Sequence, residues 1–88
     1  MKLSEIMERY RPESWGRNET WQEHARRLWT DEPEYMARLR AHMVRLGGWF
    51  YKPVPIDDDV VQDGHHRIVV AIGLGWTDLD VPLEMVSA

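Results

Sequence analysis

The chain contains no cysteine, and this absence removes several kinds of site at once. Disulfides, thiolate nucleophiles and thiolate metal ligands are all excluded. The sequence also has no apolar run that approaches the ~18 residues of a transmembrane helix. The segment Met1–Ile6 is not followed by the apolar stretch of a secretory signal. Together these absences predict a cytoplasmic protein without membrane contacts.

Positive charge is scarce in the second half of the chain. Residues 46–88 hold two Lys/Arg against seven Asp/Glu, whereas residues 1–45 hold nine against eight. The net charge is −4 over 88 residues, a length typical of one domain. A free-standing binder of duplex DNA usually has a basic face, but we expect a solvated helical surface with acidic neighbours instead. The arginines of that surface stand at positions 9, 11, 17, 26, 27, 38, 40 and 45.

Helical periodicity marks the first 48 residues. A short helix is expected within Leu3–Tyr10, and the polar stretch Arg11–Glu19 is expected to be a loop. Thr20 and Glu23 have the spacing of a capping box, which predicts the start of a second helix. The apolar face of this second helix, with both of its tryptophans in the core, would consist of Trp21, Ala25, Leu28 and Trp29.

A third helix is predicted after Pro33, a residue well suited to a first helical turn. Gly47-Gly48 should end it. Its apolar stripe consists of Met36, Leu39, Met43 and Leu46. His24 and His42 fall within these helical segments without a ligand partner at a useful spacing, so we expect both at the surface or at its boundary.

After Gly48 the pattern changes to short extended segments. Lys52–Ile56 and Val60–Gln62 are predicted strands, and the prolines place the first at an edge or make it irregular. A nearly all-apolar helix should follow over His66–Leu74, and a last strand over Val81–Val86. The order predicts a small α+β domain, with a mainly helical part (1–48) packed on a short mixed sheet of a second part (49–88).

The most informative segment is the run DGHHR, Asp63-Gly64-His65-His66-Arg67. It lies between a predicted strand and a predicted helix. Glycine there lets backbone N–H groups approach a ligand, and the helix presents its positive end to an anion. The imidazoles and the guanidinium add donors suited to phosphate. The segment therefore predicts a phosphate-binding turn.

Each residue of this turn also has a simpler interpretation. Asp63 could cap the following helix, which we favour over a metal-ligand role. His65 and His66 should point to different sides, so that only one could face a substrate as a general base; alternatively both only donate hydrogen bonds to an anion. Arg67 could instead pair with a carboxylate of Asp57–Asp59, and that triple aspartate is expected to be a solvated hairpin turn rather than a metal site.

The aromatic residues offer a further means of binding, because they could stack on nucleic-acid bases. Within Trp49–Tyr51 we expect at least one exposed ring, as the rim of a pocket or as a contact for a partner. The aromatic group comprises Trp15, Trp21, Trp29, Trp49, Phe50 and Tyr51.

Residues 39–86 resemble the ParB/sulfiredoxin superfamily, and within it the short ParB-like domains of the nuclease type. The shared pattern is a helix ending in glycine, a proline followed by a hydrophobic residue, the DGHHR turn, a helix ending Leu74-Gly75, and a last strand at Val81–Val86. The resemblance implies a turn that holds the phosphate of a nucleotide or nucleic acid. It implies CTP, as in ParB proteins, or ATP, as in sulfiredoxins, with Mg²⁺.

By position, the resemblance makes Gly64 the turn glycine and Arg67 the phosphate ligand. Pro53 and Val54 fall where the family's strand lines the pocket. His66 matches a histidine of the sulfiredoxin motif, and His65 replaces its cysteine, so sulfiredoxin chemistry is lost. No helix-turn-helix follows the motif, which excludes a complete partition protein and suggests a phage or mobile-element accessory protein.

Two hypotheses of different classes follow from the sequence. The first is a ParB-like module that binds nucleotide or nucleic-acid phosphate at residues 63–67, with nuclease or nucleotide-hydrolase activity as an extension in which His65 or His66 is the base. The second is a non-catalytic module that keeps the fold as a scaffold. In that case the Trp- and Arg-rich helices would bind a protein partner or form a homodimer.

Overall fold

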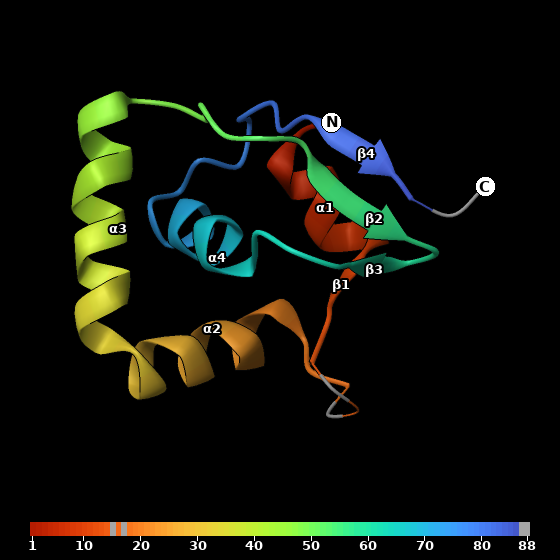
Figure 1. Cartoon of the computed structure of the whole chain (residues 1–88), viewed down its shortest axis with the longest axis horizontal. Helices are drawn as coiled ribbons and strands as arrows, with labels where there is room; N and C mark the ends of the chain where they lie inside the picture. The colour runs from red at the N-terminus through yellow and green to blue at the C-terminus, as the bar shows by residue number, and fades with distance from the viewer. Residues whose placement is uncertain (15, 17, 87–88) are drawn as a thin grey trace.

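A computed structural model describes residues 1–14, 16 and 18–86, and these form an α+β fold with four helices and one four-stranded mixed sheet (Figure 1). The predicted fold class is therefore confirmed. Trp15 and Arg17 lie outside the described residues. The elements in chain order are α1 (Leu3–Arg9), β1 (Arg11–Pro12), α2 (Trp21–Asp31), α3 (Pro33–Leu46), β2 (Val54–Asp57), β3 (Val60–Val61), α4 (His65–Gly73) and β4 (Leu83–Met85).

The sheet has the strand order β1-β3-β2-β4. β2 and β3 form an antiparallel hairpin, and each pairs in parallel with one outer strand. The prediction that Arg11–Glu19 is a loop was wrong at its start, because Arg11 and Pro12 pair with Val60 and Val61. Such a strand of two residues has no periodicity that a sequence pattern could reveal.

The strand at Lys52–Ile56 was predicted to be at an edge or irregular, and the first alternative was wrong, because β2 lies in the interior of the sheet. Proline is tolerated here because of its register. Pro55 turns its peptide groups toward β3, and its carbonyl accepts a hydrogen bond from the Gln62 N–H at 2.9 Å. Proline has no backbone N–H, and an N–H at position 55 would have faced Gln62, which lies one residue beyond the end of β3. The missing hydrogen bond thus falls where the hairpin ends.

Helix α4 is the centre of the fold and contacts both α2 and α3 (Figure 1). Four consecutive residues, Ile68 to Ala71, are buried, as predicted for a helix that is apolar nearly all round. The same core includes buried side chains from α1, α3 and β2, namely Leu3, Ile6, Met36, Met43 and Ile56. The N-terminus of α4 is thereby fixed next to the sheet.

None of the helices built by the described residues combines the length and the apolar character needed to cross a membrane.

The buried face of α2 is rotated from the predicted one. Trp21 and Leu28 are buried, but Trp29 keeps 36% of its surface exposed, so its assignment to the core was wrong. His24 is only 1% exposed, and its prediction as a surface or boundary residue was wrong as well. Positions 21, 24 and 28 follow the i, i+3, i+7 spacing of one helical face, which leaves position 29 at the edge of that face. The third helix ends as predicted at Gly47, which has a φ of 73°.

The capping box at the start of α2 gives a direct test of local stability. The Glu23 N–H donates to Thr20 Oγ1 at 3.1 Å, and the Thr20 N–H donates to Glu23 Oε1 at 3.0 Å. Thr20→Ala should lower the free energy of unfolding by about 1 kcal/mol in urea denaturation. Thr30→Ala is the matched control, because Thr30 lies in the last turn of the same helix and caps nothing. Equal losses for the two variants would contradict this role of Thr20.

Candidate functional site

The turn before α4 depends on a glycine in the left-handed region. Gly64 has a φ of 83° and is the N-cap of α4, where its carbonyl accepts from the Ile68 N–H at 3.0 Å. A side chain is disfavoured at this φ, which explains why glycine stands here. The prediction that Asp63 caps this helix was wrong, because the N-cap is Gly64. Asp63 Oδ1 accepts from the Gly64 N–H at 2.8 Å and so holds the turn from outside the helix.

A cavity of about 460 Å³ opens in front of this turn. Five of the seven predicted phosphate-binding residues line it: Pro53, Val54, Asp63, Gly64 and Arg67. The remaining wall comes from the segment between α3 and β2, namely Trp49, Phe50, Tyr51 and Lys52, together with Pro55 of β2. Phe50 is 70% exposed, which confirms the prediction of an exposed ring in this cluster. The cavity thus combines two cations, one carboxylate and an aromatic wall.

Arg67 is held by an aromatic ring rather than by a carboxylate. Its guanidinium carbon lies 4.1 Å from the centroid of the Tyr51 ring, a cation–π contact. Tyr51 is in turn packed edge-on against Trp49, with the ring centroids 5.4 Å apart. Within the part of the chain that the structure describes, no carboxylate forms an ion pair with Arg67, and Asp59 of the nearby triple aspartate pairs with Arg11 at 3.3 Å. The charge of Arg67 therefore remains available to a ligand.

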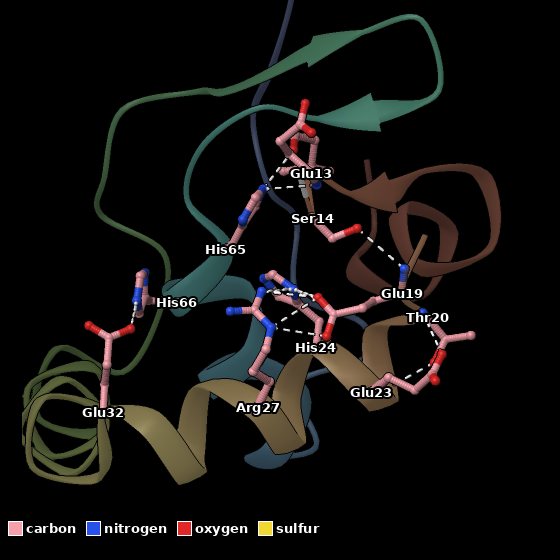
Figure 2. A network of polar contacts seen from close by, with 11 residues as sticks. Glu13, Ser14, Glu19, Thr20, Glu23, His24, Arg27, Glu32, His65 and His66 are labelled. Atoms are coloured by element: carbon pink, nitrogen blue, oxygen red, sulfur yellow. Dashed lines mark hydrogen bonds and ion pairs between the residues drawn. The ribbon is translucent and has the colours of Figure 1, made fainter. Parts of the chain in front are cut away.

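The two histidines of the motif point in different directions, and neither lines the cavity (Figure 2). His65 Nε2 lies 2.6 Å from the Val61 carbonyl oxygen, to which it donates, and its ring packs edge-on against Trp21 of α2. His66 Nε2 lies 2.9 Å from Glu32 Oε2, and its ring contacts Tyr35 with centroids 5.1 Å apart. The two imidazoles point to different sides, as expected. A general base at this site would have to face the cavity, and neither ring lines it.

A partly buried polar cluster near the turn was not predicted from the sequence. We call it the Glu19 cluster, and it consists of Glu19, His24 and Arg27 (Figure 2). Arg27 donates from Nε and Nη2 to Glu19 at 3.0–3.1 Å, and Glu19 Oε1 lies 3.0 Å from His24 Nδ1. The hydrogen bonds from Arg27 lower the pKa of Glu19 to about 2.

This cluster reaches the motif through its histidine. The rings of His24 and His65 meet edge-on with their centroids 4.9 Å apart, and Trp21 packs edge-on against both. Trp21 is itself fixed, since its indole N–H donates to the Tyr10 carbonyl at 2.8 Å. A chain of rings therefore supports the start of α4 from below. His24 Nε2 is buried and has no hydrogen-bond partner in the described structure.

Burial of these two rings predicts a loss of stability in acid. Burial lowers the pKa of His24 and of His65 below the ordinary 6.5. Below pH ~6.5 the unfolded chain therefore binds protons that the folded chain does not, and the free energy of unfolding falls with pH. The low pKa of Glu19 adds a further loss below pH ~4.5, where the unfolded carboxyl becomes protonated. The urea midpoint should be constant above pH 7.5 and fall between pH 6.5 and 5.

The control for this profile is His42→Gln, because His42 is exposed and lies outside the Glu19 cluster. That variant should keep the profile of the unaltered chain. A urea midpoint that does not change between pH 7.5 and 5 would contradict the assignment of neutral, buried imidazoles.

The triple aspartate forms the predicted hairpin turn with two of its three residues, because Asp57 is still paired in β2. Asp58 and Asp59 connect β2 to β3, and Asp58 adopts a φ of 55°. Across residues 1–14, 16 and 18–86, no three His, Asp or Glu side chains are placed to hold a metal ion together.

Comparisons of the chain with models of protein families, with curated proteins and with solved structures found no match. The ParB/sulfiredoxin resemblance therefore stands on the motif residues alone. Any function has to be argued from the cavity and its lining.

Proposed function

We propose that this protein binds the phosphate of a nucleotide or of a nucleic acid in the cavity at the N-terminus of α4. The observation that carries the proposal is the arginine of the motif. Arg67 lines the cavity and forms no ion pair with a carboxylate among the described residues, and its guanidinium carbon lies 4.1 Å from the centroid of the Tyr51 ring. A guanidinium held in one plane can donate two parallel hydrogen bonds to a phosphate.

The surroundings of Arg67 favour an anion in two further ways. The first N–H groups of α4 have no acceptor within the helix, and the helix dipole makes this end positive. Lys52 adds a second positive charge to the lining, against the single carboxylate of Asp63. The Gly64 N–H is already used by Asp63, so the backbone donors left for a ligand are those of the following turn.

The size and the walls of the cavity suit a nucleotide. Its volume of about 460 Å³ falls within the range of ordinary small-molecule sites. Phe50 offers a largely exposed ring on which a base can stack. The resemblance to ParB proteins and sulfiredoxins points to the same turn, and it makes CTP and ATP the first ligands to test. Mg²⁺ would be held mainly by the phosphates, since Asp63 is the one carboxylate among the lining residues.

The test is a thermal-shift series with CTP, ATP, GTP and a short single-stranded DNA, each with and without Mg²⁺. A ligand at 100 times its Kd should stabilise the folded state by about 2.7 kcal/mol and raise Tm. Sodium chloride at the same ionic strength is the control for a general salt effect. If none of these ligands raises Tm above the sodium chloride control at millimolar concentration, the proposal fails.

Hydrolysis is not included in the proposal, because neither His65 nor His66 lines the cavity. The second hypothesis, a protein-interaction or homodimerisation module, draws on the exposed side chains of Trp29, Tyr35 and Val44. Tyr35 and Val44 are nine residues apart in α3 and so face opposite sides of the helix, which divides the apolar surface. We therefore place this function second. Sedimentation that shows a concentration-dependent dimer, combined with no ligand-induced shift, would reverse the order.

A further inference from the structure

The arginines of the first half of the chain fall into two groups. Arg9, Arg11 and Arg27 pair with carboxylates, as the prediction of acidic neighbours requires. Within the described residues no ion pair is formed by Arg26 of α2 or by Arg38, Arg40 and Arg45 of α3. The prediction of acidic neighbours holds for Arg38, which lines a hollow together with Asp31, Glu32 and Glu34, but not for the rest of α3. From Tyr35 to Ile56 the chain has no acidic residue.

Helical geometry gathers part of this positive charge on one side of α3. Arg38, His42 and Arg45 stand at i, i+4 and i+7, which is the spacing of a single face, and all three are exposed. We call these three residues the α3 basic face, and it extends about 10 Å along the helix. Arg40 lies on the other side of α3.

The α3 basic face adjoins the cavity. The His42 ring lies 6.4 Å from the ring of Tyr51, which carries Arg67 on its face. Toward the other end of α3, Tyr35 precedes Arg38 by three residues and contacts His66 of α4. In Figure 1 the segment that leaves the C-terminal end of α3 passes above α4 into β2. This segment supplies the aromatic wall of the cavity, so the wall follows α3 directly in the chain.

From this arrangement we infer that the α3 basic face, Lys52 and the cavity form one surface for a single-stranded nucleic acid. The inference rests on the proposed function and specifies its ligand. One phosphate occupies the cavity at Arg67, and neighbouring phosphates of the same strand lie along Arg38 and Arg45. Lys52 bridges the two parts, since it lines the cavity and follows α3 in the chain.

The aromatic residues decide in favour of a single strand over a duplex. Phe50 is 70% exposed and lines the cavity with Lys52 and Arg67, and Tyr35 is 45% exposed and lines a second hollow with Arg38. Exposed rings next to basic residues can stack on unpaired bases, whereas the faces of paired bases are covered within a duplex. Asp31, Glu32 and Glu34 line a hollow together with Arg38, and they limit the positively charged surface at the N-terminal end of α3.

The test compares two double variants that remove the same charge. Arg38→Gln/Arg45→Gln alters the α3 basic face, whereas Arg26→Gln/Arg40→Gln removes two arginines outside it. Binding of a fluorescent 5′-phosphorylated oligothymidylate of eight nucleotides is followed by anisotropy between 50 and 200 mM salt. The first variant should lose about tenfold or more in affinity. The slope of log affinity against log salt concentration should be shallower by about 1.4 for this variant, because each of the two lost phosphate contacts contributes about 0.7. The second variant should bind as the unaltered chain does.

Mononucleotide affinity separates this inference from the proposed function. Both double variants should bind the mononucleotide as tightly as the unaltered chain, because the cavity is intact in each. Equal weakening of oligonucleotide binding by the two double variants would overturn the inference, as would equal affinity for a duplex of the same length. Oligonucleotide binding no tighter than mononucleotide binding would also overturn it and leave the cavity proposal standing. Failure of every ligand, mononucleotides included, would remove both.

Discussion

Arg67→Ala should weaken binding of the cavity ligand by about 10- to 100-fold and leave the fold intact. Hydrogen bonds to a charged group contribute about 1.5–3 kcal/mol, which corresponds to this range of affinity. Stability should change little, because Arg67 is only half-buried and its side chain forms no ion pair within the described residues. Isothermal titration with the nucleotide that gives the largest thermal shift would measure the loss.

Two further variants define what Arg67 does. Arg67→Lys keeps the charge but loses the planar fork and much of the stacking on Tyr51, so it should recover only part of the affinity. Arg26→Ala, in an exposed position of α2, should bind as the unaltered chain does. Unchanged affinity in Arg67→Ala would remove this residue from the site. Unfolding of Arg67→Ala would instead assign it a structural role.

Glu19→Ala should be among the most destabilising single changes outside the apolar core, with a loss of about 2–3 kcal/mol in the free energy of unfolding. Glu19 accepts the hydrogen bonds of Arg27 and contacts His24, and its side chain is only 11% exposed. Without it, the Arg27 guanidinium and the His24 ring would remain largely covered and lack their acceptor. Urea denaturation at pH 7.5 gives the value directly.

The control for this change is Glu34→Ala, which removes the same charge from an exposed position in the first turn of α3 and should cost about 0.5 kcal/mol. The double variant Glu19→Ala/Arg27→Ala should lose less than the sum of the two single changes, because each single change already breaks the shared hydrogen bonds. Equal small losses for Glu19→Ala and Glu34→Ala would show that the Glu19 cluster contributes nothing to folding.

Features that depend on neighbours in the sequence could be predicted. The capping box at Thr20 and Glu23, the αL end of α3 at Gly47 and the buried run in α4 are all local patterns. The central position of β2 could not be predicted, because proline statistics disfavour it and only the register of the hairpin makes it acceptable. The exposure of Trp29 was missed for a related reason. The packing partners of α2, and not its apolar pattern alone, set which face is buried.

The candidate site likewise has one part that could be predicted from the sequence and one part that could not. Gly64 and Arg67 belong to one turn, and Pro53 and Val54 belong to the adjoining strand, so the sequence brought together residues that do line one cavity. The Glu19 cluster joins a residue before α2 to two residues within it, and it meets His65 only through tertiary packing. One signal was present. His24 and Arg27 lie close to the face that Trp21 and Leu28 bury, and polar residues there suggest a buried pair.

Pro55 has a consequence for where the turn at Gly64 stands. In an antiparallel pair, hydrogen-bonded residues that face each other exchange two hydrogen bonds, one in each direction. Pro55 and Gln62 form only one of these, because the ring nitrogen of proline has no hydrogen, and the regular pairing of β2 with β3 ends at Val61. Four residues later the chain starts α4, so the proposed anion-binding turn follows directly on an incomplete pair of the hairpin.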